Sequence, residues 1–303
     1  MKGKKLIASV LVLVMAFSLC ACGSSNTTTA GTANTAASTT AANTTAANTT
    51  ASAAANTAAN TTAASADSDI SYIKGKGTLV VGITDFAPMD YKDTNDSSKW
   101  IGFDADLATE VAKQLGVTVQ FEEIDWDNKI LELNNKSIDV VWNGMTLTDE
   151  VTSSMECTKP YCNNAQVVVV PSDKAASYQT EDSLKDLTFA VEAGSAGEAA
   201  AKEKGLNYTS LQSQSDALME VAAGTSDACI IDLLMAGAMI GEGTSYTNLT
   251  HTVELTSEEY GIGCRKGSDL AAYIDTVLDG LSKDGTLQTI AKTYGVQDAL
   301  VTR

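Results

Sequence analysis

Histidine and cysteine, the residue types typical of zinc sites and of many catalytic triads, are few in this 303-residue sequence. It holds six cysteines and a single histidine, His251. One histidine cannot form a zinc cluster or a histidine-based catalytic triad, and we expect His251 at the surface. Gly261, Gly263 and Gly267 lack the spacing and strand–turn–helix context of a dinucleotide site. The sequence therefore predicts neither an enzyme nor a metal or cofactor site.

Cys22 is placed for covalent attachment of lipid. Three lysines lie within the first five residues, and residues 6–19 form an apolar run too short to span a bilayer. Leu19-Cys20-Ala21-Cys22 then resembles the bacterial lipobox, in which the cysteine sulfur takes a diacylglycerol and the chain is cut before it. This pattern predicts a signal peptide at residues 1–21 and a lipid anchor on Cys22 at the extracellular face of the cell membrane. An ordinary secretory signal with a chance cysteine is the alternative.

Residues 22–68 are predicted to be a lipid-anchored tether. They consist almost wholly of Thr, Ala, Asn and Ser in near-repeats, so they have too little apolar surface to offset the entropy of ordering. A flexible chain of about 45 residues spans on the order of 35 to 40 Å.

Charge narrows the classes of partner. The formal net charge is −18, and removal of the three signal-peptide lysines would make it −21. Such a chain is repelled by nucleic acid and by anionic lipid surfaces. We therefore expect no nucleic-acid partner, and membrane contact through the lipid anchor alone.

Four further cysteines, Cys157, Cys162, Cys229 and Cys264, fall in the globular part. Export permits disulfides, and four cysteines allow three complete pairings. Cys157 and Cys162 are separated by four residues, which is compatible with a small disulfide loop or with two free thiols. Cys229 lies within an apolar run, which favours a buried free thiol.

Strand and helix patterns alternate after the tether, which favours an α/β fold with parallel sheets. The helix near residues 104–115 is expected to begin at Asp104 as its cap. Expected strands are at residues 78–83, 117–121, 138–142, 167–170, 187–191 and 228–231, and further helices at 198–204, 270–281 and 287–294.

Short motifs recur in order through residues 79–295. They are Val81-Gly82-Ile83-Thr84-Asp85 with Ala87-Pro88, Gly102-Phe103-Asp104-Ala105-Asp106-Leu107, Asp125-Trp126-Asp127, residues 139–148, Pro160-Tyr161, Gly194-Ser195, residues 226–232, and Asp284-Gly285-Thr286-Leu287. In this order and spacing the chain resembles the family 3 solute-binding proteins, the polar amino acid binding proteins of ABC importers.

The resemblance implies a two-lobed periplasmic-binding-protein-like fold of type II, with two hinge strands and a ligand cleft between the lobes. Lobe 1 is expected at about 69–161 and 262–303, and lobe 2 at about 165–258. The implied partners are an amino acid or amine, and an ABC permease in the membrane with its cytoplasmic ATPase. The protein is expected to be a monomer.

The resemblance also implies a ligand site. Asp232, at the end of a buried strand, matches the position that binds the ligand's ammonium group, although a solvated strand-end acid is the plain alternative. Ser195 matches a helix N-terminus that receives the carboxylate, or it is simply an N-cap. The other implied ligand-binding residues are Asn143, Gly144 and Thr146 for polar contacts, Trp126 and Phe86 as walls, and, less specifically, Trp142.

One departure from the family pattern bears on the ligand. Where the family usually carries an arginine that clamps the α-carboxylate, this chain has Val151. Either Ser195 and backbone amides hold the carboxylate, or the ligand has none there. Glu192 and Asp85 also match positions in the family's cleft. Together with Asp232 and the aromatic Trp126 they would favour a cationic group through ion pairing and cation–π contact. The sequence thus favours a basic amino acid or an organic amine.

Two other functions fit the same scaffold. Exported cyclohexadienyl dehydratases resemble this family, but their carboxylate substrates suit an acidic chain without the arginine poorly. A binding protein that presents its ligand to a receptor would need the same cleft as one that serves import. Fold alone does not separate these functions.

Overall fold

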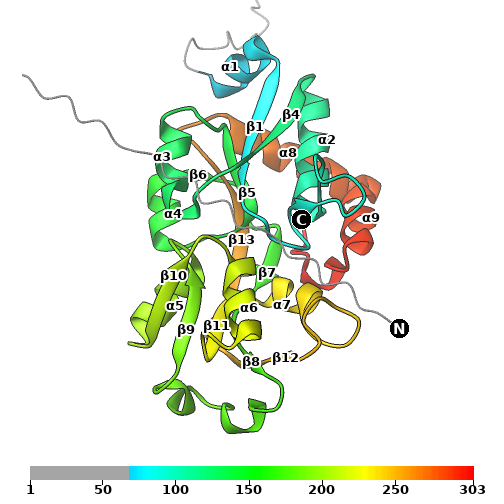
Figure 1. Cartoon of the computed structure of the whole chain (residues 1–303). Helices are drawn as coiled ribbons and strands as arrows, with labels where there is room; N and C mark the ends of the chain where they lie inside the picture. The colour runs from blue at the N-terminus through cyan, green and yellow to red at the C-terminus, as the bar shows by residue number, and fades with distance from the viewer. Residues whose placement is uncertain (1–67) are drawn as a thin grey trace, which may run out of the picture. The chain divides into compact units, whose positions relative to one another are not determined.

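The computed structural model describes residues 68–303 (Figure 1). The predicted signal peptide and the lipidation of Cys22 lie outside the described residues, as does the predicted tether except for its last residue, Ser68. Ser68 is the N-cap of the first helix, α1 (Asp69–Lys76). No helix in residues 68–303 is long and apolar enough to cross a membrane.

A first sheet forms from the two ends of this region. Its order is β4-β1-β5-β13-β6, with β7 also paired to β13; β4 and β5 run parallel to β1, whereas β13 is antiparallel to β5. The strands are β1 (Thr78–Ile83), β4 (Thr118–Glu123), β5 (Val140–Thr146), β6 (Glu156–Cys157), β7 (Cys162–Asn164) and β13 (Glu258–Cys264). A polar hairpin, β2 (Tyr91–Lys92) with β3 (Trp100–Ile101), stands apart.

The apolar run of β1 explains why both faces of this sheet are covered. Successive strand residues point to opposite faces. Leu79, Val81 and Ile83 enter one core cluster, and Val80 enters another. The helices of this lobe are α1, α2 (Phe103–Leu115), α3 (Lys129–Asn134), α4 (Asp149–Ser154), α8 (Leu270–Asp284) and α9 (Thr286–Thr293), with the short turns η1 (Trp126–Asn128) and η4 (Gln297–Ala299).

A second sheet forms from the middle of the chain, in the order β10-β9-β11-β8-β12. Strands β9, β10 and β11 are parallel, and β8 and β12 are antiparallel to their neighbours. Its elements are β8 (Gln166–Pro171), η2 (Ala175–Ser177), η3 (Glu181–Leu184), β9 (Thr188–Glu192), α5 (Ala196–Glu203), β10 (Asn207–Leu211), α6 (Gln214–Ala223), β11 (Ala228–Asp232), α7 (Leu233–Met239) and β12 (Leu249–Glu254).

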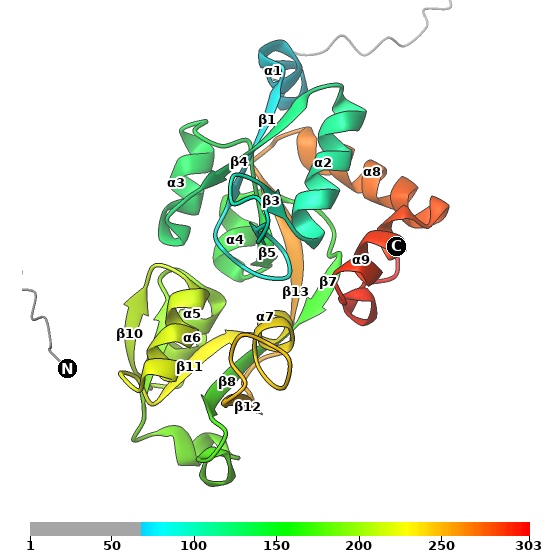
Figure 2. The same ribbon diagram turned by 45° about the vertical axis from the view of Figure 1, so that its right-hand side comes forward.

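Two chain segments join the sheets, as Figure 2 shows where β7 leads into β8 and β12 leads back into β13. The first crossing is at Ala165 and the second over residues 255–257. The amide of Leu255 donates to the carbonyl of Gln166 at 2.8 Å, so the crossings are tied to each other. Below, lobe 1 denotes residues 68–164 and 258–303, and lobe 2 denotes residues 165–257.

The structure gives the start of α2 and the state of the four cysteines. Asp104 is not the cap of α2: Gly102 takes that position, and the buried Asp104 carboxylate instead accepts from the Gly144 amide at 2.7 Å and the Tyr161 hydroxyl at 2.8 Å. A buried carboxylate needs such donors, so it points into the protein. The four cysteines of the described region are free, and Cys229 is buried as expected.

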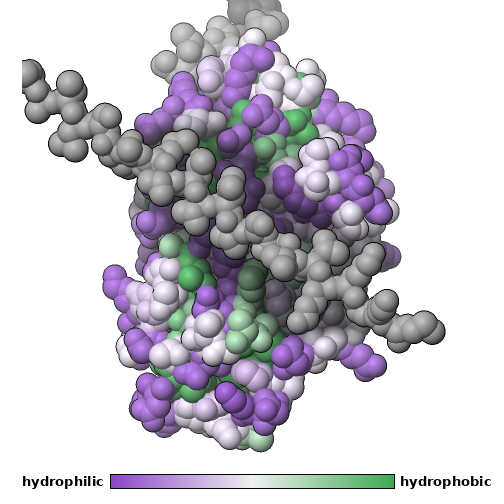
Figure 3. Space-filling model, in the orientation of Figure 1, coloured by the Kyte–Doolittle hydropathy of each residue, from purple (hydrophilic) through white to green (hydrophobic). Residues whose placement is uncertain are grey.

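The surface of the described region is mostly polar, as expected for a chain with a strongly negative net charge. The face in Figure 3 is mostly hydrophilic, with hydrophobic residues in small groups. Large hydrophobic side chains exposed on the described surface are Tyr72, Leu131 and Met219.

Candidate functional site

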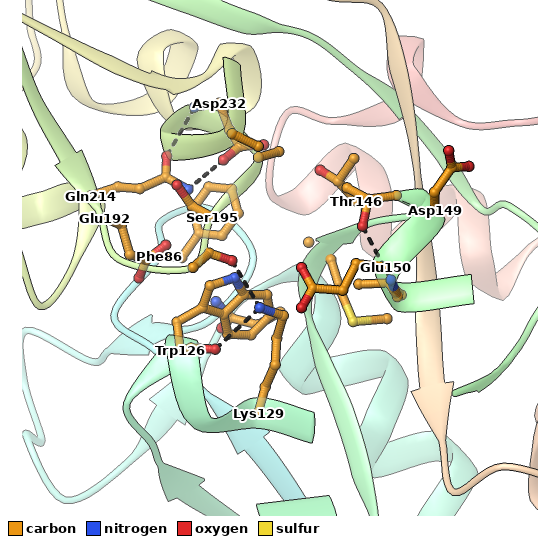
Figure 4. A pocket seen from close by; sticks show the side chains of 18 residues that line it. Phe86, Trp126, Lys129, Thr146, Asp149, Glu150, Glu192, Ser195, Gln214 and Asp232 are labelled. Atoms are coloured by element: carbon orange, nitrogen blue, oxygen red, sulfur yellow. Dashed lines mark hydrogen bonds between the residues drawn. The ribbon is translucent and has the colours of Figure 1, made fainter. Parts of the chain in front are cut away.

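A cavity of about 220 Å³ lies between the two lobes. It collects eight of the nine residues expected at a ligand site, namely Phe86, Trp126, Asn143, Gly144, Thr146, Glu192, Ser195 and Asp232 (Figure 4). The ninth, Asp85, is exposed and lines separate hollows of the surface. Trp142, the weaker wall candidate, is fully buried in the core of lobe 1.

Strand ends bring these residues together. Phe86 follows β1, Gly144 and Thr146 end β5, and Glu192 and Asp232 end β9 and β11. The carboxyl ends of parallel strands in α/β sheets are where ligands bind, because side chains there are held by the strands but not covered by the following helices.

Asp232 is saturated by protein donors. It is 4% exposed, and four side chains donate to its two carboxylate oxygens. The donors are Tyr260 at 2.6 Å, Gln166 at 3.1 Å, Asn164 and Gln214. Desolvation, together with the nearby charge of Glu258, raises the pKa of Asp232 to about 7. Since its oxygens are already hydrogen-bonded, Asp232 has little capacity left for a ligand ammonium group.

The polar side chains of Thr146 and Asn143 also form hydrogen bonds to other residues of lobe 1. Thr146 Oγ1 donates to Glu258 Oε1 at 2.8 Å, and Asn143 pairs with the backbone and hydroxyl of Thr84 at 3.1 and 3.0 Å. Phe86 packs edge-on against Tyr260, with ring centroids 6.4 Å apart. These residues line the cavity, but the polar side-chain atoms of Thr146 and Asn143 already form hydrogen bonds within the protein.

Glu192 differs from Asp232 in having an unused oxygen. It is 3% exposed, and among the described residues its Oε1 has no hydrogen-bond partner. Desolvation and the neighbouring charge of Asp232 raise the pKa of Glu192 to about 8. A buried carboxylate in this condition favours a proton or a cationic group beside it.

Ser195 is the N-cap of α5, because its hydroxyl accepts from the Glu198 amide at 3.0 Å. Gly194 precedes it with a positive φ of 69°, which turns the chain from β9 into the helix. Ser195 and Ala196 both line the cavity. The amides of Ala196 and Gly197, in the first turn, have no acceptor within the helix and favour an anion.

Lys129 is the feature that the sequence reading missed. It opens α3, is 6% exposed, and lines the cavity beside Trp126 (Figure 4). Its Nζ donates to the Trp126 carbonyl at 3.2 Å and to the Gly194 carbonyl of lobe 2 at 2.8 Å, and lies 5.0 Å from the centroid of the Trp126 ring. Burial lowers the pKa of Lys129, while surrounding acids, foremost Glu150, oppose that effect.

Val151 is buried in lobe 1, where its amide donates to the Thr148 hydroxyl that caps α4. The preceding Asp149 and Glu150 are exposed and line the Thr146 side of the cavity (Figure 4). The cation lining the cavity within the described chain is thus Lys129.

The lobes touch each other across the cleft. A Cβ added to Gly194 would lie 2.7 Å from Asp127 Cα, so only glycine permits this approach. Ser215 Oγ also donates to the Asp85 carbonyl at 3.2 Å, and Gln212 donates to Asp125. Together with Lys129 and Gly194, these contacts define a closed arrangement of the lobes.

Two α/β lobes joined by two crossing segments, with a closed cavity between them, define a ligand-binding protein of the type II periplasmic-binding-protein class. A sequence profile of bacterial extracellular solute-binding proteins, family 3, matches residues 79–297, and the chain belongs to that family.

Similar proteins bind amino acids. The L-cystine-binding protein TcyJ of Escherichia coli (strain K12) is 27% identical over 229 residues, which cover 74% of this chain and 85% of TcyJ. The arginine-bound form of a truncated ArgBP from T. maritima is 33% identical with a TM-score of 0.65, covering 70% of this chain and 99% of that structure. An ancestral amino acid-binding protein, AncCDT-1, a precursor of cyclohexadienyl dehydratase, is 31% identical with a TM-score of 0.68, covering 75% and 99%.

Proposed function

We propose that this protein is the extracytoplasmic substrate-binding lipoprotein of an ABC importer and that it captures an amino acid, preferentially a basic one, between its lobes. The observation that carries the proposal is the cavity of about 220 Å³ between the lobes, which is lined from both lobes by buried groups able to carry opposite charges, Lys129 and Glu192. A zwitterion needs such a pair of charges and walls for its side chain.

The preference for a basic side chain rests on the acids around the cavity. Asp149 and Glu150 line its exposed side, and Trp126 offers an aromatic face. A ligand cation near these groups gains from ion pairing and from the ring quadrupole. The arginine-bound T. maritima structure supports a basic ligand, whereas the cystine-binding relative supports a larger polar one.

Delivery to a membrane permease is proposed from family membership and from the lipobox at Cys22. A lipid on Cys22 and a tether over residues 22–68 would hold the lobes near the permease while leaving them able to turn. Radiolabelled palmitate incorporated into the wild type but not into Cys22→Ala would support the anchor; equal labelling of the two would contradict it.

A thermal-shift screen of the purified protein tests the ligand class, because a ligand that binds the folded state raises the unfolding midpoint. Arginine, lysine, ornithine, histidine, cystine, glutamate and the corresponding amines form the panel. Stabilisation by basic amino acids is expected. Tight binding of glutamate without any response to basic amino acids would refute the basic preference, and turnover of prephenate or arogenate would replace binding by dehydratase activity.

A further inference from the structure

We propose that Lys129 binds the ligand's α-carboxylate in place of the absent arginine, and that Glu192, not Asp232, binds its α-ammonium group. This inference rests on the proposed function, since it requires an amino acid ligand. It assigns the two charged groups on the ligand's α-carbon to two residues on opposite lobes.

Lys129 is a buried cation that has acids near it but makes no direct ion pair with any of them. None of the ion pairs within residues 68–303 includes it. Its two hydrogen bonds go to neutral carbonyl oxygens, and an ammonium group has three donors. A buried charge is costly to leave unpaired, so an anion entering the cavity gains both the charge and the third N–H of Lys129.

The start of α5 adds to this anion site. Lys129 contacts the Gly194 carbonyl at 2.8 Å, and the next two residues, Ser195 and Ala196, line the same cavity. The side chain of Glu198 does not compete, because its two oxygens accept from the Gly194 amide and from Ser210. A carboxylate can therefore contact Lys129 and the first amides of the helix together.

The comparison of the two buried acids assigns the ammonium group. Asp232 accepts from four side chains of the protein, whereas Glu192 lines the cavity and its buried Oε1 has no partner among the described residues. An ammonium group that displaced a donor of Asp232 would leave that donor unpaired, which costs about 1–3 kcal/mol. Contact with Oε1 of Glu192, which has no donor to displace, carries no such loss.

This assignment also couples binding to closure. Lys129 belongs to lobe 1 and Glu192 to lobe 2. A ligand that contacts both gains its full interaction only when the lobes are closed, and it therefore shifts the population toward the closed form.

Isothermal titration with matched ligands tests the carboxylate assignment. Each amino acid is paired with the amine that lacks only its α-carboxylate: arginine with agmatine, lysine with cadaverine, and histidine with histamine. The wild type is expected to bind the amino acid about 100-fold more tightly than the amine, as a desolvated charge pair warrants. Lys129→Met should lose about 100-fold for the amino acid and leave the amine nearly unchanged.

The matched control is Lys113→Met, which removes an exposed lysine of lobe 1 and should change neither affinity. If Lys129→Met weakens amino acid and amine equally, or neither, Lys129 is not the carboxylate anchor. The wild-type comparison needs no variant, so equal affinity for arginine and agmatine overturns the assignment even if Lys129→Met fails to fold.

The ammonium assignment is tested with δ-guanidinovalerate, which is arginine without its amine. Glu192→Gln should weaken arginine about 100-fold but not δ-guanidinovalerate, and Asp232→Asn should have a smaller effect on the difference between them. The reverse order would return the role to Asp232. If the wild type binds no amino acid of the panel, the proposed function fails and the inference fails with it; if it binds one but the variants behave alike, only the inference fails.

Discussion

Replacing Glu192 by glutamine should change how the stability of the ligand-free protein depends on pH. Glutamine keeps the size of the side chain but cannot ionise. The carboxyl group of Glu192 has a pKa of about 8 in the folded protein, against an ordinary value of 4.5, because it is buried beside Asp232. Folding therefore favours the protonated form between these two pH values.

The sign follows from proton binding. Between pH 4.5 and about 8 the folded state holds a proton on Glu192 that the unfolded chain has released, so the stability of the wild type falls as pH rises through this window. At about 1.36 kcal/mol for each pKa unit, the loss reaches up to about 5 kcal/mol above pH 8. Glu192→Gln lacks this loss. Its advantage should be near zero at pH 4.5 and largest above pH 8.

Urea unfolding at pH 5, 7 and 9 measures the difference, with ligand removed by unfolding, dialysis and refolding. Titrating groups remote from Glu192 cancel because both proteins contain them, whereas Asp232 is coupled to Glu192 and its titration contributes to the measured difference. Glu203→Gln, the same substitution at an exposed position of α5, is the matched control. If the wild type and Glu192→Gln curves run parallel in pH, Glu192 ionises normally and the account of its burial is refuted.

Three further outcomes are expected. Titration of arginine at pH 7 in buffers of different ionisation enthalpy should show the wild type releasing about one proton more than Glu192→Gln, because an ammonium group favours the ionised form of Glu192; equal proton release would exclude an ammonium beside it. Gly194→Ala should weaken binding about tenfold and enlarge the ligand-bound radius of gyration in small-angle scattering, because its Cβ would lie 2.7 Å from Asp127 Cα; wild-type affinity and radius would mean that the lobes close without this contact. Tyr260→Phe should lower the free energy of unfolding by about 1–3 kcal/mol, since Asp232 loses a donor at 2.6 Å; a change below about 0.5 kcal/mol in urea unfolding would show that water replaces it.

The sequence predicted the parts that depend on local pattern. The strand expected at residues 78–83 is observed with those bounds, because its β-branched, largely apolar run suits a strand covered on both faces. Ser195 is an N-cap, as a serine three residues before a glutamate suggests. Motif order then led to the family.

The charges of the cavity could not be predicted from local pattern. Lys129 lies in a helix that would ordinarily expose its lysine, and it is buried because lobe 2 brings the Gly194 carbonyl to it from 65 positions away. Its distance of three residues from Trp126 was the one available signal, since such residues share a helical face. The place of Asp232 at the end of an apolar strand predicted that it would be buried. It could not predict the four side chains that donate hydrogen bonds to its carboxylate, because they come from three other strands and from α6.

The uneven exposure of the acids around the cavity bears on selectivity. Asp149 and Glu150 face water, where a charge pair contributes only about 0–1 kcal/mol, so they favour a basic over a neutral side chain by at most about fivefold. Lys129 and Glu192 are buried, where a mismatched or missing charge is far more costly. With the ligand oriented as proposed, the protein should bind molecules that lack an α-carboxylate or an α-ammonium group very weakly. It should bind amino acids with side chains of different length with similar affinity. If the protein serves import as proposed, a cell would take up several amino acids through one transporter, and these amino acids would compete with one another for it.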